Sequence, residues 1–461
     1  MMRPFSGDPM PTTITNYDGS ISTTPRRVVK PTTVEEIQAI LSQPNNFPSP
    51  VRAMGSYHSL TPCASSTGTI VDMTSMKKVV KIDRQAMTLT AQAGLEMIEA
   101  NRALREQKLQ FMLNIEIGNL TVGSAACCHT KDSLDGVEFG QVSSYVIGVK
   151  WVTPAGTLAE ASLSTNPELL PFIRGSHGLA GIVYEVTFRI KPIEIVKFDY
   201  HLHETADLTQ DIVESVLSSN QTMVAWTVDK TTVLQTRNPA TELRKDFLAH
   251  SRQFGWNFLG AFAGRVIRQL TPEGSTGADD LGTSIEIGFY RLISALGGFT
   301  LQGPDKMIDY SKTPQIARYA FTFWAFPRAA WVTNLQDYVV FRDQHFRQHG
   351  FRCNLPLGSY FVRQDTNSLL SYTADGDMIS LDPIHAPGKR DADDWNRFLD
   401  AFNEWAHARG GIPLLNQSPF LKKAHVVSAY GERWTQLCTW IREQDPNGRM
   451  VNAFFKELMV D

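Results

Sequence analysis

The sequence lacks several features that would assign it to a well-known class. Its 461 residues carry 44 Lys and Arg against 47 Asp and Glu, so no basic surplus favours nucleic acid or an anionic membrane as partner. Five cysteines are too few, and odd in number, for a disulfide-framed secreted domain. No run of about 18 apolar residues occurs that could span a membrane; the richest stretch, Ala320 to Phe326, ends at Pro327. A small-molecule partner is therefore expected.

The first residues also lack the pattern of a signal peptide, because Gly7, Asp8 and Pro9 come before any apolar run can start. With the low cysteine content, this predicts a cytoplasmic protein in a reducing compartment. We expect a monomer or a small homo-oligomer, with no nucleic-acid and no membrane partner.

Common catalytic motifs are missing as well. There is no Gly-x-Gly-x-x-Gly between a strand and a helix, no Walker loop, no Gly-x-Ser-x-Gly elbow and no His-Glu-x-x-His. His201 and His203 could point to the same side of a strand as metal ligands, but no obvious third ligand lies near them. We therefore expect no metal.

What is present predicts a large α+β protein. At about 150 residues per domain, the length suggests two or three domains, and 42% apolar residues suffice for large cores. Thr33 and Glu36 form a capping box ahead of a helix. Residues 145–160 read as a β-hairpin around Pro154-Ala155-Gly156, and residues 272–284, with three glycines and three acids, read as a loop. Trp395, Phe398, Leu399, Phe402 and Trp405 form one apolar helical stripe, which indicates core.

Two short segments rich in Gly and Ser could approach a ligand closely. In residues 51–59, a strand runs into a tight turn, Gly55-Ser56-Tyr57-His58-Ser59, whose amides and hydroxyls could bind a pyrophosphate. Residues 118–126 contain Thr121, Gly123 and Ser124, whose small side chains leave the backbone accessible. Taken singly, either segment could be an ordinary turn.

Their order along the chain resembles the flavin-binding domain of the vanillyl-alcohol oxidase superfamily, and most of all its aldonolactone and alditol oxidase branch. The matching pieces span Val28 to Pro192, and the segment from Trp434 to Asn452 resembles the C-terminal signature of that branch. They are Val29 to Ile37, Arg52 with Gly55 to Ser59, Ile70 to Met73, Gly94, Thr121 to Ala125, Val152 to Gly156, and Arg174 to Val183.

The resemblance implies a two-domain PCMH-type FAD-binding fold, with an inserted substrate domain built on an antiparallel sheet with flanking helices. Residues 1–24, rich in Thr, Pro, Gly and Ser, predict an irregular arm. The resemblance places the FAD domain at 25–193, the substrate domain at 194–425, and a C-terminal segment returning to the FAD domain at 426–461. FAD is the implied cofactor, and the histidine of the first turn, His58, is the position of a covalent bond to the flavin 8α-methyl. A second bond is not expected, since Asn119 stands where doubly tethered relatives have cysteine. The cofactor-binding residues it implies are Met54, Gly55, Ser56, Tyr57, His58, Ser59, Thr121, Gly123, Ser124, Cys128, His129 and Ile182.

Departures from the family pattern bear on the substrate. A charged loop, His129-Thr130-Lys131-Asp132-Ser133, replaces Gly-Thr-His-Gly-Ser, and the Glu-x-Arg pair of polyol and lactone oxidases becomes Phe361-Val362-Arg363. Further on, Pro413-Leu414-Leu415-Asn416-Gln417 lacks the lysine of the family. Because hydroxyl-rich substrates need polar partners, these changes predict a fairly apolar substrate.

The resulting hypothesis is an FAD-dependent oxidase. It would transfer a hydride from an alcohol-type carbon, or from a cyclic amine or lactol, to flavin N5, and oxygen would reoxidise the flavin to give hydrogen peroxide. Arg363 would anchor or polarise the substrate, and Asn416 and Gln417 would orient it. His129, Tyr360 and Asp365 are candidates for the general base by residue type alone. The alternative is an FAD-dependent dehydrogenase of a sugar lactone or related metabolite that uses an acceptor other than oxygen.

Overall fold

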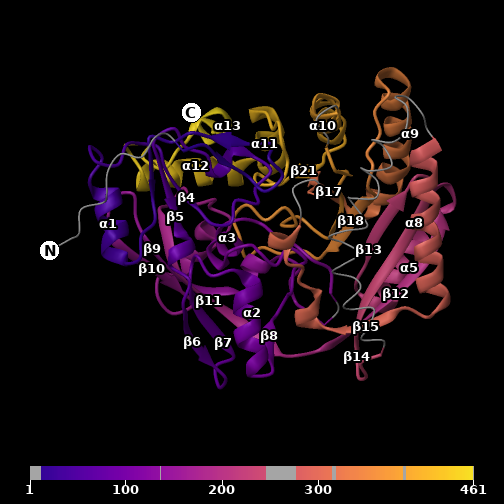
Figure 1. Cartoon of the computed structure of the whole chain (residues 1–461), viewed down its shortest axis with the longest axis horizontal. Helices are drawn as coiled ribbons and strands as arrows, with labels where there is room; N and C mark the ends of the chain where they lie inside the picture. Colours follow the sequence, from indigo (N-terminus) through magenta and orange to yellow (C-terminus); the bar gives the residue numbers. More distant parts are fainter. Residues whose placement is uncertain (1–11, 135, 245–276, 314–317, 388–390, 460–461) are drawn as a thin grey trace.

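A computed structural model describes residues 12–134, 136–244, 277–313, 318–387 and 391–459. Figure 1 shows two neighbouring groups of elements: the N-terminal strands and helices with the C-terminal helices on one side, and a large sheet with its own helices on the other. The mixed helix and sheet composition and this two-part architecture confirm the predicted fold class.

The N-terminal part begins with a small parallel sheet that carries the predicted turn. Its order is β3-β5-β4, with β3 at Arg27–Val29, β4 at Val51–Met54 and β5 at Thr69–Asp72. Helix α1 (Val34–Ser42) connects β3 to β4 and starts with the predicted capping box between Thr33 and Glu36. The turn at residues 55–59 leaves the carboxyl end of β4, where ligands commonly bind in parallel sheets.

A six-stranded antiparallel sheet follows, in the order β10-β9-β11-β7-β6, with β8 paired to the end of β11. The hairpin predicted at 145–160 is present as β9 and β10. The elements are β6 (Val79–Asp83), β7 (Thr88–Gln92), α2 (Met97–Glu106), β8 (Leu109–Phe111), α3 (Val122–Cys127), β9 (Val146–Val152), β10 (Leu158–Ser162), α4 (Leu170–Ile173) and β11 (Ile182–Pro192).

The middle of the chain forms an eight-stranded antiparallel sheet in the order β15-β12-β14-β13-β18-β19-β17-β21. The strands are β12 (Ile195–Glu204), β13 (Val224–Val228), β14 (Thr231–Ala240), β15 (Phe299–Gln302), β17 (Trp324–Pro327), β18 (Leu357–Val362), β19 (Met378–Leu381) and β21 (Ile412–Pro413). Its helices are α5 (Gln210–Asn220), α8 (Gly277–Ala295), α9 (Trp331–His349) and α10 (Ala392–His407). Two short pairs complete the strands: β1 (Ile14–Thr15) with β2 (Ser22–Thr23), and β16 (Ala320–Phe321) with β20 (Ile384–His385).

The chain then returns to its N-terminal part. Helices α11 (Lys423–Tyr430), α12 (Glu432–Gln444) and α13 (Ala453–Leu458), yellow in Figure 1, lie beside the indigo strands β4 and β5. The N–H of Val51 donates to the carbonyl of Arg449 at 2.7 Å, and Arg449 Nε donates to the carbonyl of Leu41 at 2.7 Å. These bonds attach the C-terminal segment to the base of the strand that carries the turn.

Two hydrophobic cores hold this arrangement. The larger runs through the six-stranded sheet, part of the eight-stranded sheet and the C-terminal helices. The smaller lies between the eight-stranded sheet and α5, α9 and α10. The α10 stripe predicted as core belongs to it, since Trp395, Phe398, Leu399 and Phe402 are all buried and Trp405 packs against them.

Two local expectations need correction. Residues 272–276 lie outside the described residues, but from Gly277 onward the expected loop is helix α8, which buries Tyr290 and Ile293 in the larger core. The arm expected at 1–24 lies outside the described residues up to 11, and β1 and β2 form a short hairpin in the rest. Across the described part of the chain, no helix is long and apolar enough to cross a membrane.

Candidate functional site

The turn after β4 presents backbone N–H groups that have no partner. Within the described residues, none of the N–H groups of residues 56–59 donates a hydrogen bond to the protein. Tyr57 has a φ of 54°, a left-handed conformation that makes successive N–H groups converge as in anion-binding nests. The turn therefore fits a group such as a pyrophosphate.

A second segment packs directly against this turn. A Cβ atom on Gly55 would lie 2.4 Å from Thr121 Oγ1 and 2.8 Å from Thr121 Cγ2, so only glycine allows this approach. The hydroxyl of Ser56 donates to the carbonyl of Asn119, and the hydroxyls of Thr121 and Ser124 hydrogen-bond to each other at 3.0 Å. Hydroxyl groups from both segments are thus gathered around the turn.

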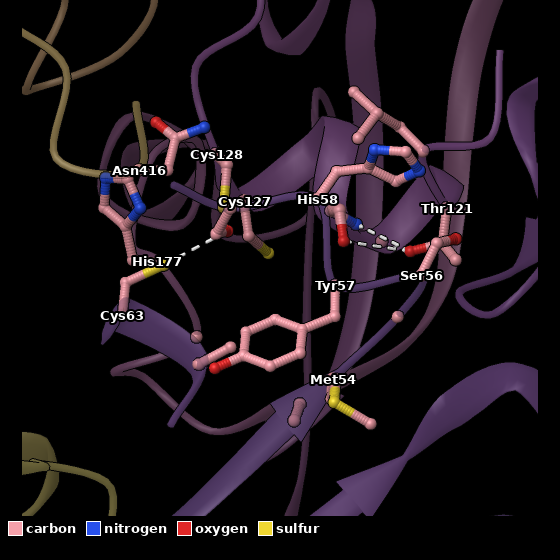
Figure 2. Close-up of a pocket in the computed structure, with 18 of the residues that line it drawn as sticks. Met54, Ser56, Tyr57, His58, Cys63, Thr121, Cys127, Cys128, His177 and Asn416 are labelled. Atoms are coloured by element: carbon pink, nitrogen blue, oxygen red, sulfur yellow. Dashed lines mark hydrogen bonds between the residues drawn. The ribbon is translucent and has the colours of Figure 1, made fainter. Parts of the chain in front are cut away.

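A cavity opens over these two segments. About 1030 Å³ of space, open solvent included, lies between the residues that line it. Figure 2 shows His58, Ser56 and Thr121 on one side of it and His177 with Cys63 on the other. The turn on its wall fits the pyrophosphate of a ligand such as FAD.

His58 is held at the edge of the turn as a neutral imidazole. Its ring stacks on Tyr17, with centroids 4.6 Å apart, and meets the edge of the Tyr310 ring at 6.5 Å. Burial, followed by the positive charge of Arg318, lowers the pKa of His58 to about 4. Near neutral pH the ring is therefore neutral, and one of its two nitrogens carries no proton and is available to a ligand.

His177 lines the same cavity and was missed by sequence reasoning. It is 4% exposed, and within the described residues neither of its ring nitrogens has a hydrogen-bond partner. Burial, and then His129 and Arg52, lower its pKa well below the ordinary value. Because buried polar atoms are almost always paired, this imidazole indicates a ligand atom in the cavity. The only sequence signal was its place in the run Gly175-Ser176-His177-Gly178.

A second cavity of about 650 Å³, open solvent included, adjoins the first. The two share Ile117, Leu120, Thr130, Phe321 and Gln417 in their walls. The second is lined in addition by four charged residues and five rings or apolar side chains from both halves of the molecule: Glu116, Lys131, Asp132, Asp382, Trp226, Tyr310, Tyr319, Tyr360 and Ile384, with Ile115 completing the wall.

All four of these charged residues are paired, two of them with each other and two with residues behind the lining. The guanidinium of Arg237 contacts Asp132 and, at 3.1 Å, Glu116, while the Lys306 ammonium also contacts Asp132. Lys131 Nζ lies 3.0 Å from Asp382 Oδ2. Charge is lost at 361 and 417, but segments distant in the sequence supply other charged groups, so this cavity combines paired charges with a largely aromatic and aliphatic lining.

The structure brings most of the predicted site residues together. Met54 to Ser59, Thr121, Gly123, Ser124, Cys128, Asn416 and Gln417 all line the first cavity. Two predicted cofactor residues do not. His129 is buried behind the wall and shares a 2.9 Å hydrogen bond between its Nε2 and Ser368 Oγ, and Ile182 is a fully buried core residue at the start of β11.

Arg363 lies outside both cavities. Its guanidinium donates to the carbonyl of Val137 at 3.1 Å and to Gln221 Oε1 at 2.7 Å. Because these bonds hold it at the surface, the geometry does not support a substrate-binding role. Of the three candidates for a general base, only Tyr360 lines a cavity; Asp365 is buried and accepts a bond from Ser144. Among the described residues, no group of His, Cys, Asp or Glu is arranged to hold a metal ion.

Comparisons with known proteins agree with this site. Residues 25–162 match the family described as FAD binding domain. The chain is 22% identical over 450 residues to L-gulonolactone oxidase of Scyliorhinus torazame, covering 96% of this chain and 97% of that one. It is 26% identical over 189 residues to L-gulono-1,4-lactone dehydrogenase of Mycobacterium tuberculosis, which is 41% of this chain and 42% of the relative.

Among solved structures, cholesterol oxidase from B. sterolicum superimposes with a TM-score of 0.71 at 14% identity, covering 100% of this chain and 99% of that chain. At that identity the likeness concerns the fold alone. The fold, the turn with its cavity and the family match together define an FAD-dependent oxidoreductase. Residues 25–162 therefore carry an FAD-binding domain, and over nearly its whole length the chain is similar to an L-gulonolactone oxidase. The comparisons thus support the resemblance to the PCMH-type FAD oxidase superfamily and to its aldonolactone branch.

Proposed function

We propose that this protein oxidises an alcohol carbon of a hydroxyl-bearing small molecule of the sugar-lactone type. The observation that carries the proposal is the second cavity, which places charged side chains among its aromatic and aliphatic lining and shares Thr130 and Gln417 with the cofactor cavity. Hydroxyl-rich substrates need such partners. The relatives named as L-gulonolactone oxidase and L-gulono-1,4-lactone dehydrogenase support the same substrate class.

The residues of the first cavity have distinct tasks in this proposal. The N–H groups of residues 56–59 would bind the FAD pyrophosphate, and the hydroxyls of Thr121 and Ser124 would stand beside it. FAD, when bound, supplies the acceptor for the hydride of the substrate. Asn416 Oδ1 and Gln417 Oε1, both buried without a partner among the described residues, would orient cofactor or substrate at the junction of the two cavities.

His58 is the proposed site of a covalent bond to the flavin 8α-methyl carbon. Support comes from its neutral imidazole, which lines the cavity at the end of the turn. Forming this C–N bond breaks a C–H bond of the methyl group and the N–H bond of the imidazole. Oxygen would accept the two electrons and two protons that are released. After acid precipitation of the pure protein, flavin fluorescence should stay in the pellet for the wild type and for His201→Ala, an exposed control, but not for His58→Ala. Flavin found only in the supernatant of the wild type would refute the bond.

The activity is tested by mixing the flavin-loaded protein with L-gulono-1,4-lactone without oxygen. We expect the flavin absorbance to bleach, and a panel of sugar lactones and polyols then ranks the substrates. If cholesterol or another apolar alcohol bleached the flavin while every lactone and polyol failed, the proposed substrate class would be wrong.

Oxygen is the proposed acceptor. Admission of air to the bleached protein should restore the flavin absorbance within the turnover time and release hydrogen peroxide. Slow recovery in air, with fast recovery on addition of a quinone or cytochrome c, would instead establish the dehydrogenase.

A further inference from the structure

Lys131 and Asp382 form a buried ion pair on one wall of the second cavity. Lys131 Nζ lies 3.0 Å from Asp382 Oδ2, and the two side chains are 8% and 4% exposed. The rings of Phe323 at 4.3 Å and Tyr360 at 4.9 Å surround the ammonium group. These cation–π contacts fix its position without using its N–H donors.

This wall has hydrogen-bonding capacity left over. Among the described residues, Asp382 is the one acceptor that Lys131 Nζ reaches, although an ammonium group has three donors. Asp382 Oδ1, Thr130 Oγ1 and Gln417 Oε1 are buried and likewise have no partner within the described part of the chain. Because buried polar atoms are almost always paired, a set of unpaired ones lining one cavity points to a ligand.

The other polar groups of the cavity behave differently. The carboxylate of Glu116 accepts from Arg237 at 3.1 Å and from the hydroxyl of Tyr360 at 3.2 Å. Tyr319 and Tyr310 hydrogen-bond to each other through their hydroxyls at 2.7 Å. Because these groups pair with one another, we expect discrimination between ligands to rest with Lys131, Asp382 and the polar atoms named with them.

We infer that Lys131 and Asp382 determine substrate specificity. They recognise, by hydrogen bonds, a substrate in which a carbonyl or ring oxygen lies next to a hydroxyl, as in a 2-hydroxy lactone. Lys131 Nζ donates to the carbonyl or ring oxygen, and Asp382 Oδ1 accepts from the neighbouring hydroxyl. The inference deepens the proposed function and rests on it for the identity of the second cavity. It also gives a role to the charged loop 129–133, which contributes the cation from the FAD-domain side.

The experiment compares two probes that differ by one hydroxyl, α-hydroxy-γ-butyrolactone and γ-butyrolactone. Each is titrated into the flavin-loaded full chain, and the apparent Kd is taken from the rise in unfolding temperature. The wild type should bind the hydroxylated lactone about tenfold or more tightly, since a hydrogen bond to a charged group is worth about 1.5–3 kcal/mol.

The decisive variant is Lys131→Met combined with Asp382→Leu, because replacing both members of a buried pair by apolar residues is often neutral for folding. Its preference should fall below about twofold while its flavin content stays unchanged. Lys191→Met is the matched control, since Lys191 is a buried lysine paired with Glu194 at 2.5 Å outside both cavities. It should keep the wild-type preference.

A merely structural pair would change the unfolding temperature and leave the preference intact, and that result would overturn the inference. A wild type that binds neither probe, or binds both equally, would overturn it as well. Bleaching by L-gulono-1,4-lactone is read separately. A preference that depends on Lys131 without bleaching would mean that the pair binds a hydroxylated lactone but that the proposed function fails, and with it the role of the pair in substrate specificity.

Discussion

Arg52 Nη1 donates to the carbonyl oxygen of Met450 at 2.8 Å, across 398 residues of chain. The same guanidinium donates to the carbonyls of Cys63, at 3.0 Å, and His177. Arg52 is thus a buried junction between the strand that carries the cofactor turn, the loop of His177 and the C-terminal segment. The three acceptors lie far apart in sequence, and one side chain holds them together beside the first cavity.

We expect Arg52→Ala to lower the free energy of unfolding by at least about 2 kcal/mol, because three backbone carbonyls would lose a charged donor. The same change should reduce the flavin retained after purification. Arg442→Ala, at an exposed position of α12, is the control and should match the wild type in both. Unfolding in urea, followed by fluorescence, measures the first effect and the ratio of flavin to protein absorbance measures the second.

Gly55→Ala should abolish flavin binding while leaving most of the fold intact, since the new Cβ would lie 2.4 Å from Thr121 Oγ1 and push the two cofactor segments apart. Gly288→Ala, where the Cβ meets nothing within 4 Å, should bind flavin normally. The ratio of flavin to protein absorbance decides between them. Full flavin occupancy in Gly55→Ala would show that the turn is not the cofactor site.

Acid should destabilise the protein through its buried histidines. Burial, and then Arg433, lower the pKa of His129 from 6.5 to about 4, so between these values the unfolded chain binds a proton that the folded chain does not. The free energy of unfolding is therefore full above about pH 6.5 and falls as the pH drops toward 4, by up to about 1.4 kcal/mol per pH unit for each such group.

His129→Asn should make this pH dependence shallower by as much as one proton, whereas His201→Asn, at an exposed position of β12, should leave it unchanged. The unfolding midpoint in urea, measured from pH 4 to 8, reports the slope. Equal slopes for the wild type and His129→Asn would mean that this imidazole does not titrate on unfolding in that range.

Arg363→Ala tests the role that the family pattern suggested for this residue. Because its guanidinium bonds to Val137 and Gln221 outside both cavities, we expect kcat/KM to stay within about threefold of the wild type, less than about 0.7 kcal/mol. Gln417→Ala, at the junction of the cavities, should lower it about tenfold or more. Steady-state kinetics with the best lactone of the panel makes the comparison. A larger loss of kcat/KM in Arg363→Ala than in Gln417→Ala would show that Arg363 does belong to the substrate site.

Local patterns in the sequence were sufficient for much of the fold. The α1 capping box at Thr33 and Glu36 and the hairpin of β9 and β10 depend on residues close in sequence, and the structure confirms both. The turn at 55–59 could likewise be singled out, because its spacing is local. The apolar stretch from Ala320 to Phe326 is divided between β16 and β17, because its two ends pair with different strands.

The polar wall of the second cavity was beyond local reasoning. Glu116, Lys131 and Asp382 come from three segments that meet only through the tertiary fold, and nothing in their spacing indicates the contact. The loss of the family's charged residues at 361 and 417 could be seen in the sequence. The charged side chains that other segments bring to the same cavity could not. The unpaired nitrogens of His177 were hidden for the same reason, because only the packed structure shows that they lack partners.

The bond between Arg52 and Met450 also has a consequence for biosynthesis. The first β-strands leave the ribosome long before the carbonyl that Arg52 requires has been made, because 398 residues separate the two. Domains that are continuous in sequence can fold in order as they emerge. Here the cofactor half must wait, with an unsatisfied guanidinium, until the eight-stranded sheet and its helices have been synthesised. Flavin capture is therefore expected to be a late event, after the inserted half of the protein has emerged.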